Sequence, residues 1–381
     1  MQYRIITLAA TLVTCLLSSG AWAADAADEV TQMKREILNL KHKIERLEKS
    51  RKTEKIPEAE GGHWFERIEM SGLVEVEAGY VDGPDGTESD LAVATVELGL
   101  DAQVTPWVNG HVLFLHEEDA DDPIEIDEAI VTIANPEVSP FSLAAGRMYV
   151  PFGNFDSALV SDPLTLEIGE TRETAVQLGW LANGFHALAY GFNGDTNDGG
   201  SDQIDGYGLS LGYSREAEGD SPGFDAGLSW ISNLADSDSL QETMTDPGGL
   251  ADAVAGWSAH AALHWRAFTL VGEYLSAAHD FDAADLDFHG ADARPSAWNL
   301  EVDYSFGMAG RDAKLAVAWQ GTGEALALEL PEQRWLAALS LDIHDQTTLA
   351  IEYAHDQDYG VSDGGSGEDS DTVTLQLAVA F

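Results

Sequence analysis

The chain has almost no cysteine and very little positive charge. Of its 381 residues, one is a cysteine, Cys15, and it lies in an N-terminal segment that we expect to be removed. The mature protein should therefore have no thiol, no disulfide and no cysteine metal site. Lysine and arginine total 19 against 67 aspartates and glutamates, a formal net charge of −48. Because phosphate contacts need basic groups, this deficit argues against nucleic-acid binding.

The chain also lacks a run of about 20 apolar residues beyond its N-terminus, which predicts no transmembrane helix. At the N-terminus, Arg4 precedes a shorter apolar stretch over 5–17, and small residues surround a cleavage point near Ala23. This arrangement predicts a signal peptide over residues 1–23. If an exported chain without such a helix belongs in a membrane, it must form a closed barrel, because open sheet edges cannot face lipid.

Short segments of alternating apolar and polar residues follow one another from residue 64 to the end. The last one, 371–381, carries one apolar and one polar face and ends on Phe381, as the final strand of an outer-membrane barrel does. Sixteen such segments are found, at 66–80, 90–103, 108–117, 124–134, 140–150, 174–182, 185–193, 205–214, 223–234, 254–265, 267–278, 296–307, 312–320, 333–343, 347–357 and 371–381. Short connections alternate with long ones such as 151–173. The pattern predicts an all-β fold, a transmembrane antiparallel up-and-down β-barrel of about 16 strands over 64–381, in the bacterial outer membrane.

Several predicted strands carry carboxylates on one face and apolar residues on the other. Since a carboxylate cannot face hydrocarbon cheaply, these side chains should line a wet lumen. The lumen-lining candidates are Glu69, Glu75, Glu77, Glu301 and Asp303. Tryptophans on or near the strand ends, such as Trp257 and Trp335, are expected in the aromatic girdles at the two membrane interfaces.

The negative charge lies almost wholly in the predicted barrel. Residues 64–381 hold fifty-eight acidic and nine basic residues, with Lys314 as the only lysine, whereas the charges of 24–63 cancel. An acidic lumen concentrates cations and repels anions. Adaptation to high salt is an alternative source of the same composition, and the sequence leaves both open.

Residues 24–50 show a different pattern. Val30, Met33, Ile37, Leu40, Ile44 and Leu47 follow steps of three and four, which predicts a periplasmic coiled coil, with 51–63 as a polar linker. The seam suits self-association, and a homotrimer is one expectation, although Ile and Leu in this order nominally favour two strands. A single amphipathic helix is the alternative.

The segment 146–173 is unlike the rest of the chain. It contains P-F-G-N-F at 151–155, S-D-P-L-T-L-E at 161–167 and G-E-T-R-E at 169–173. With the signal peptide, coiled coil, linker and acidic barrel in this order, the segment resembles the LbtU-type siderophore porins. The resemblance implies uptake of an iron siderophore across the outer membrane without an energised plug, and the forty residues before the barrel are too few for a plug domain.

The long connection 151–173 is the third on the external side, and in general porins that loop narrows the lumen. Its charged residues, together with an arginine on the preceding strand, are therefore candidates for a constriction. They are Asp162, Glu167, Glu170, Arg172, Glu173 and Arg147. Alternatively, Arg172 pairs with Glu170 or with a carboxylate of the wall and only secures the loop.

Other groups of polar residues give weaker indications of a binding site. His260 and His264 lie about 13 Å apart along one strand face, too far to chelate one ion, and are expected to be polar lumen residues. The acidic run 117–122 lacks the glycine and terminal glutamate of a helix–loop–helix calcium site, so a solvated loop is expected. No arrangement predicts a metal site, a cofactor or a catalytic site, so we do not expect an enzyme.

Together these observations predict a porin for passive, selective permeation of a siderophore or small cationic solute through an acidic lumen. Its other partners would be outer-membrane lipid and, through Phe381, the barrel assembly machinery. A strongly anionic siderophore would be disfavoured unless Arg172 and Arg147 compensate. A general cation-selective porin for small nutrients, or a barrel that tethers the envelope through the coiled coil, are the alternatives.

Overall fold

A computed structural model describes residues 67–84, 86–118, 124–196, 204–244 and 246–381 of the chain. The signal peptide, the coiled coil and the polar linker expected from the sequence lie outside these residues, as does most of the acidic run 117–122.

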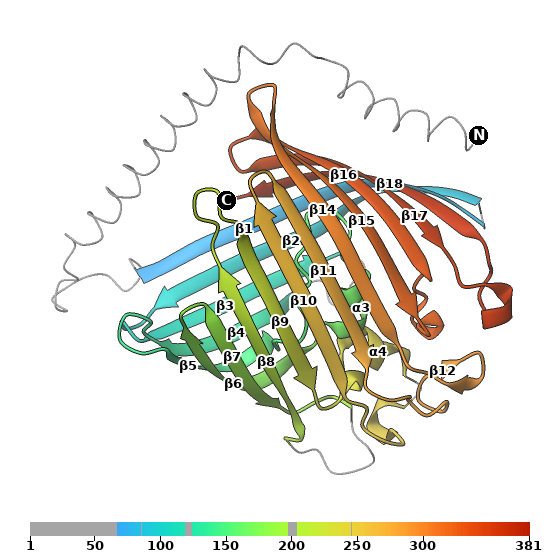
Figure 1. Cartoon of the computed structure of the whole chain (residues 1–381), viewed down its shortest axis with the longest axis horizontal. Helices are drawn as coiled ribbons and strands as arrows, with labels where there is room; N and C mark the ends of the chain where they lie inside the picture. Colours follow the sequence, from blue (N-terminus) through green and yellow to red (C-terminus); the bar gives the residue numbers. More distant parts are fainter. Residues whose placement is uncertain (1–66, 85, 119–123, 197–203, 245) are drawn as a thin grey trace. The chain divides into compact units, whose positions relative to one another are not determined.

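Sixteen antiparallel strands close into one barrel, which confirms the predicted fold class (Figure 1). Strands that are neighbours in the sequence pair with one another, except that β11 pairs with β14, and β18 closes the ring against β1. The barrel strands are β1 (Ile68–Gly83), β2 (Gly86–Gln103), β3 (Val108–Glu117), β4 (Glu125–Ala134), β5 (Phe141–Tyr149), β6 (Arg172–Ala182), β7 (Phe185–Phe192), β8 (Gly206–Arg215), β9 (Gly223–Ile231), β10 (Gly256–Trp265), β11 (Phe268–Ala277), β14 (Ser296–Met308), β15 (Arg311–Gly323), β16 (Gln333–His344), β17 (Thr347–Gln357) and β18 (Asp369–Ala380).

The clearest differences from the sequence prediction lie in three places. Residues 81–89, expected as a connection, mostly extend β1 and β2 to a tight turn. The loop 279–295 contains a two-stranded hairpin, β12 (Asp287–Phe288) with β13 (Ala291–Asp292). Arg172 and Glu173, expected in the third loop, open strand β6, because they pair in register with Tyr149 and Met148 of β5.

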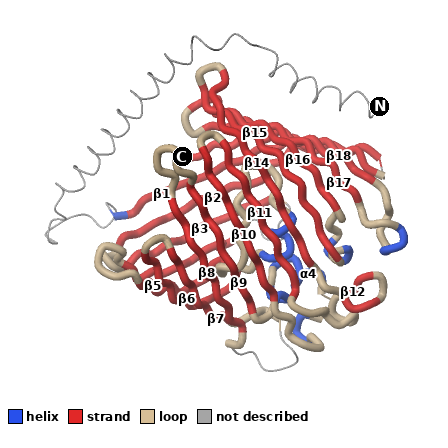
Figure 2. Tube along the Cα trace, viewed as in Figure 1, coloured by secondary structure: helices blue, strands red, loops and turns tan. Residues whose placement is uncertain are grey.

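The connections at the two ends of the barrel differ in length, as predicted (Figure 2). One end has short turns, such as the one between β10 and β11, where Arg266 adopts a left-handed conformation. The other end has most of the long loops, which carry the helices α3 (Leu164–Gly169) and α4 (Asp238–Thr243). In outer-membrane barrels the short turns face the periplasm and the long loops face outside.

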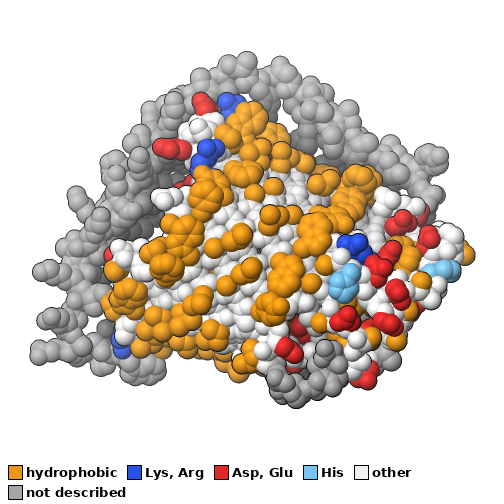
Figure 3. Space-filling view, turned by 60° about the horizontal axis from the view of Figure 1, so that its bottom comes forward, with side chains coloured by type: hydrophobic (Ala, Val, Ile, Leu, Met, Phe, Trp, Pro, Cys, Tyr) orange, Lys and Arg blue, Asp and Glu red, His pale blue; other side chains and the backbone are white. Residues whose placement is uncertain are grey.

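The outer wall of the barrel is apolar. Leu178, Leu211, Leu228 and Leu300 expose half or more of their surface, and hydrophobic side chains cover the wall in Figure 3. Aromatic pairs mark both ends of the strands: Trp298–Trp319 and Trp319–Trp335 near the loops, and Phe185–Tyr213 and Phe268–Tyr304 near the turns. From Trp257 to Trp265, β10 covers roughly 27 Å along the strand, which suits the hydrocarbon thickness once the strand is tilted.

The C-terminal residue completes the closure of the barrel. The backbone N–H of Phe381 donates to the Gly72 carbonyl at 2.9 Å, and the Gly72 N–H donates to the Phe381 carbonyl at 2.8 Å. The phenyl ring lies over Gly72, where an added Cβ would be 2.4 Å from a ring carbon. Glycine is therefore required at position 72 for the terminal ring to pack against β1.

Candidate functional site

Residues 150–171, here called loop 3, cross the interior of the barrel. Helix α3 within the loop packs against β11, β14 and β15, far from β5 and β6 where the loop begins and ends. Leu164 and Ile168 of α3 are fully buried in a cluster that includes Phe152 and Leu275. An external loop that packs on the inner wall must narrow the lumen.

Three inward glutamates of the wall hold this loop. Glu301 of β14 accepts hydrogen bonds from the Ser157 hydroxyl at 2.8 Å and the Ala158 N–H at 2.7 Å. Glu352 of β17 accepts from the N–H groups of Val160 and Ser161 at 2.7 and 3.1 Å.

The third glutamate, Glu273 of β11, accepts from the Asn154 N–H at 2.7 Å and the Thr165 hydroxyl at 2.9 Å. All three are at most 5% exposed. Charge-assisted hydrogen bonds of this kind are roughly twice as strong as neutral ones. We call these three glutamates and their strands the anchor wall.

The local sequence of loop 3 suits this path. Gly153 adopts a φ of +84°, and an added Cβ there would lie 2.3 Å from the Phe155 ring. Pro163 precedes the first residue of α3 with an extended backbone, and its carbonyl accepts from the Leu166 N–H. The P-F-G and D-P elements of the segment singled out in the sequence therefore turn the chain inward and start the helix.

Strands β1, β2 and β3 carry a second set of inward carboxylates, which make no hydrogen bond to the described residues of loop 3. Glu75 and Glu77 of β1, Glu97 of β2 and Glu117 of β3 lie on the inward faces of their strands, and we call this set the free wall. Asp162 of loop 3 lies close enough to Glu75, Glu77 and Glu117 for their charges to act on one another. The surfaces that loop 3 and the free wall present to one another are therefore both acidic.

The loop carboxylates differ in how readily they ionise. Burial, and then the charge of Glu77, raise the pKa of Asp162. Burial followed by Asp162 raises the pKa of Glu167, while Arg334 opposes the shift. Burial, and then the charges of Asp238, Asp162 and Asp127, raise the pKa of Glu170 to about 8. Crowded like charges in a confined space favour the neutral form of each group.

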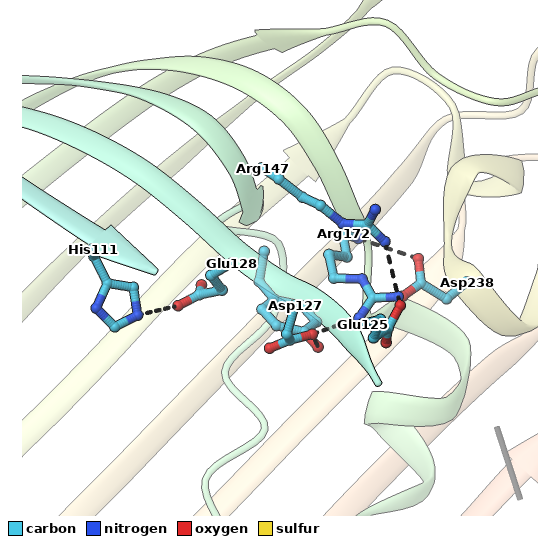
Figure 4. A network of polar contacts seen from close by, with 8 residues as sticks. His111, Glu125, Asp127, Glu128, Arg147, Arg172 and Asp238 are labelled. Carbon is cyan, nitrogen blue, oxygen red and sulfur yellow. Dashed lines mark hydrogen bonds and ion pairs between the residues drawn. The ribbon is translucent and has the colours of Figure 1, made fainter. Parts of the chain in front are cut away.

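Arg172 lies in a network of carboxylates at the outer ends of β4 and β6 (Figure 4). Its guanidinium donates to Glu125 at 2.7 Å and to Asp127, and its backbone N–H donates to Asp238 of α4 at 3.2 Å. Arg147 lies 3.8 Å from Glu125. Arg172 thus pairs with wall carboxylates, one of the two arrangements expected from the sequence. The pairing connects the end of loop 3 to strand β4.

The remaining predicted residues are distributed along the wall. Glu173 of β6 is 7% exposed, and it lies close enough to Asp195 and Asp236 for their charges to act on it. Glu69 pairs in register with Asp101 near the start of β1. Asp303 follows Glu301 on the inward face of β14 and is 6% exposed. His260 bonds to Asp225 at 3.0 Å and His264 to Thr269 at 3.3 Å, so the two histidines have separate partners.

Four residues that hold loop 3 are absent from the candidates expected from the sequence: Glu273, Glu352, Gln320 and Ser229. Gln320 accepts from the Leu164 N–H at 3.2 Å and Ser229 from the Gly153 N–H at 2.9 Å. Strand alternation alone would have placed these side chains inside. No signal in the sequence shows which inward residue meets a loop whose residues lie 76 to 192 positions away.

No helix in the described part of the chain combines the length and apolar character needed to cross a membrane. The closed barrel, the apolar outer wall, the aromatic ends and the inward loop define an outer-membrane β-barrel with the porin fold.

Comparison with solved structures supports this class. The outer membrane channel DcaP of Acinetobacter baumannii superposes with a TM-score of 0.57 at 14% identity, over 82% of this chain and 97% of that one. The anion-selective porin from Comamonas acidovorans gives 0.57 at 15% identity, over 82% and 99%. At such identities the likeness concerns the fold.

Comparison with curated sequences gives relatives but no established activity. The chain is 31% identical over 302 residues to a UPF0422 protein of Coxiella burnetii, covering 77% of this chain and 65% of that protein. It is 30% identical over 335 residues to the UPF0422 protein lpl2888 of Legionella pneumophila, covering 77% and 62%. The chain thus spans somewhat less than two thirds of these relatives' length. No protein-family model matches it.

Proposed function

We propose that the barrel is a passive outer-membrane channel that favours cations, and that its cargo is a ferric siderophore without strong negative charge. The observation that carries the proposal is the closeness of Asp162 of loop 3 to the carboxylates of the free wall, and we infer that solutes pass between them, along what we call the acidic passage. Asp162 on one side and Glu75, Glu77 and Glu117 on the other leave a permeating cation within reach of carboxylates throughout.

The contacts of the arginines also support a preference for cations. Arg172 is occupied by Glu125 and Asp127. Arg334 makes a two-pronged contact to Asp356, with distances of 2.7 and 2.9 Å. A guanidinium held by carboxylates has little capacity left for an incoming anion, so these arginines do not form an anion path.

Support for the siderophore comes from the segment that resembles the LbtU-type siderophore porins. Its three motif blocks, 151–155, 161–167 and 169–173, coincide with the inward turn of loop 3, with Asp162 and most of α3, and with the return to Arg172. The segment is therefore the part of the chain that shapes the passage. An acidic passage favours a ferric chelate whose net charge is zero or positive over a polycarboxylate chelate.

Planar-bilayer recordings test the channel and its polarity. We expect a reversal potential that indicates preference for K⁺ over Cl⁻, and the double variant Glu167→Gln/Glu170→Gln should lower that preference at alkaline pH. An anion-preferring reversal potential in the unmodified protein would reject the proposed polarity.

Two further measurements separate the cargo from the alternatives. Block of the single-channel current by a neutral ferric siderophore, together with loss of siderophore-dependent growth in a deletion strain, is expected. High conductance without block would leave a general cation-selective porin for small nutrients. Removing residues 24–63 with unaltered uptake but a detached envelope would indicate a tethering role, and cross-linking of the purified protein tests the expected homotrimer.

A further inference from the structure

A second cavity lies inside the barrel, between the first part of loop 3 and the wall of β9, β10, β11, β14 and β15. It measures about 350 Å³. Its lining comes from loop 3 at 154–158 and from inward side chains of the five strands, among them Asp225, His260, His264, Asp303 and Lys314. This cavity, here called the lower pocket, lies against the anchor wall and is separate from the acidic passage beside the free wall.

Most polar groups of the lower pocket are already bonded. Both oxygens of Glu301 accept hydrogen bonds from loop 3. His260 is bonded to Asp225 and His264 to Thr269. These residues shape the wall and have little capacity for a ligand.

Two groups of opposite charge type keep an atom for a ligand. Asp303 is 6% exposed and shares a side-chain hydrogen bond with Glu301, yet its Oδ1 atom has no hydrogen-bond partner among the described residues. Lys314 faces the same pocket, and its ammonium group makes no hydrogen bond or ion pair within the described part of the chain. A buried carboxylate oxygen without a partner is costly, so a donor from a ligand would stabilise it.

The register of β14 and β15 sets the separation of these charges. Asp303 pairs with Ala316, and Lys314 with Ser305, so the two side chains are diagonal neighbours on one face. Diagonal neighbours in an antiparallel pair lie about 7–8 Å apart at their Cα atoms. Their charges act on one another without a direct bond, which leaves room for a small molecule between them.

We propose that the lower pocket is a subsite for small zwitterionic solutes that carry a primary ammonium group and a carboxylate group. The ammonium group would donate to Asp303, with Asp156 of loop 3 nearby, and the carboxylate would accept from Lys314. A simple cation leaves Lys314 without a partner, and a simple anion meets repulsion from Asp303 and Asp156. This inference rests on the proposed channel function and names a further class of solute for it.

Three probes of matched length test the subsite: 4-aminobutyrate, butylamine and butyrate. Binding to the purified full-length protein in detergent is measured by calorimetry. We expect 4-aminobutyrate to bind at least about tenfold more tightly than either single-charge probe, with a modest affinity because a channel must release its solute.

Two variants assign the charges. Lys314→Gln should reduce 4-aminobutyrate binding to the level of butylamine while leaving butylamine binding equal or stronger. Asp303→Asn should weaken both of these probes. Arg311→Gln is the matched control, since Arg311 lies on the same strand, is exposed and does not line the pocket. Heat-modifiable gel mobility shows that each variant folds.

Equal binding of the three probes to the unmodified protein would overturn the subsite, as would a Lys314→Gln variant that retains full 4-aminobutyrate binding. These outcomes are distinct from failure of the channel proposal, which is read from the reversal potential in KCl without any probe. A cation-preferring channel that ignores 4-aminobutyrate would keep the proposed function and reject the lower pocket as a zwitterion site.

Discussion

The anchor wall and the free wall carry the same kind of side chain, inward glutamates on barrel strands, and use it in opposite ways. Glu273, Glu301 and Glu352 are buried and accept hydrogen bonds from the backbone and hydroxyl groups of loop 3. Glu75 and Glu77 lie on the far side of the passage, where Asp162 of the loop faces them. The glutamates of the anchor wall thus hold the loop, whereas those of the free wall face it with their charge.

The difference follows from where loop 3 docks. Backbone N–H groups of a loop that crosses a lumen must be satisfied, and a carboxylate can accept several of them at once. Once a glutamate is used in this way, the loop covers its charge. The glutamates that the loop does not reach keep their charge towards the solute.

The largest expected effect comes from removing the anchors. In Glu301→Ala/Glu352→Ala, the N–H groups of Ala158, Val160 and Ser161 lose their acceptors, at a cost of about 1–3 kcal/mol for each group left unsatisfied. Loop 3 should leave the wall, and single-channel conductance should rise about twofold or more, because conduction depends on the narrowest section.

The matched control for the anchors is Glu75→Ala/Glu77→Ala, which removes two carboxylates from the free wall. It should change ion preference with little change in conductance. Equal conductance in the anchor variant and the unmodified protein would contradict the scaffold role.

A smaller effect is expected from neutralising the passage itself. The triple variant Glu75→Gln/Glu77→Gln/Asp162→Asn keeps side-chain size and removes charge from both sides. The ratio of K⁺ to Cl⁻ permeability should fall by about two- to fivefold, and more at low salt, where screening is weaker. Reversal potentials at two ionic strengths measure it, and a ratio that does not move would show that the field originates elsewhere.

Arg172 connects the two regions, because it joins the end of loop 3 to Glu125 and Asp127 of β4. Arg172→Gln leaves these carboxylates without their cation and should destabilise the fold by roughly 1–3 kcal/mol, less than a fully buried pair because the site is partly open to water. Cation preference should increase.

Arg172→Lys is the control for geometry. It keeps the charge but cannot reach both carboxylates as a guanidinium does, so it should restore ion preference more than stability. Chemical unfolding in detergent and reversal potentials measure the two effects separately. Identical stability in all three proteins would show that the network is not structural.

The smallest expected effect is a pH dependence from Glu170. With a pKa raised to about 8 by burial and by Asp238, its carboxyl group is mostly neutral at pH 7 and negative at pH 9. Raising the pH therefore adds a negative charge beside the passage, and cation preference should increase between these values. Glu170→Gln should reduce this step, whereas Glu329→Gln, at an exposed loop position, should retain it in full.

Strand alternation predicted the barrel well because membrane and lumen impose opposite demands on successive side chains. Leu300, Glu301, Val302 and Asp303 alternate between the two surroundings in the structure as they do in the sequence. Boundaries were less predictable. Residues 81–89 read as a connection because they carry glycine, proline and charge, yet tight pairing of β1 with β2 extends both strands through most of them.

The candidate site was predictable only in part. The unusual segment 151–173 pointed to loop 3, and its glycine and prolines are the residues that turn it inward. The sequence did not show which glutamates bond to loop 3 and which keep their charge free, because Glu75 and Glu301 have the same local pattern. Alternation places Glu273 and Glu352 inside the barrel, but no local pattern marks them as anchors, because their partners Asn154 and Val160 lie 119 and 192 positions away.

By itself, the sequence determined the alternation that closes the barrel, the acidic character of its lumen and the position of the segment that narrows it. These are local properties, set by which side chains can face lipid and which can face water. Only the tertiary structure decided which carboxylates hold the loop, which face the solute, and that Asp303 and Lys314 share a pocket. Such choices depend on contacts between residues far apart in the chain, and no local pattern encodes them.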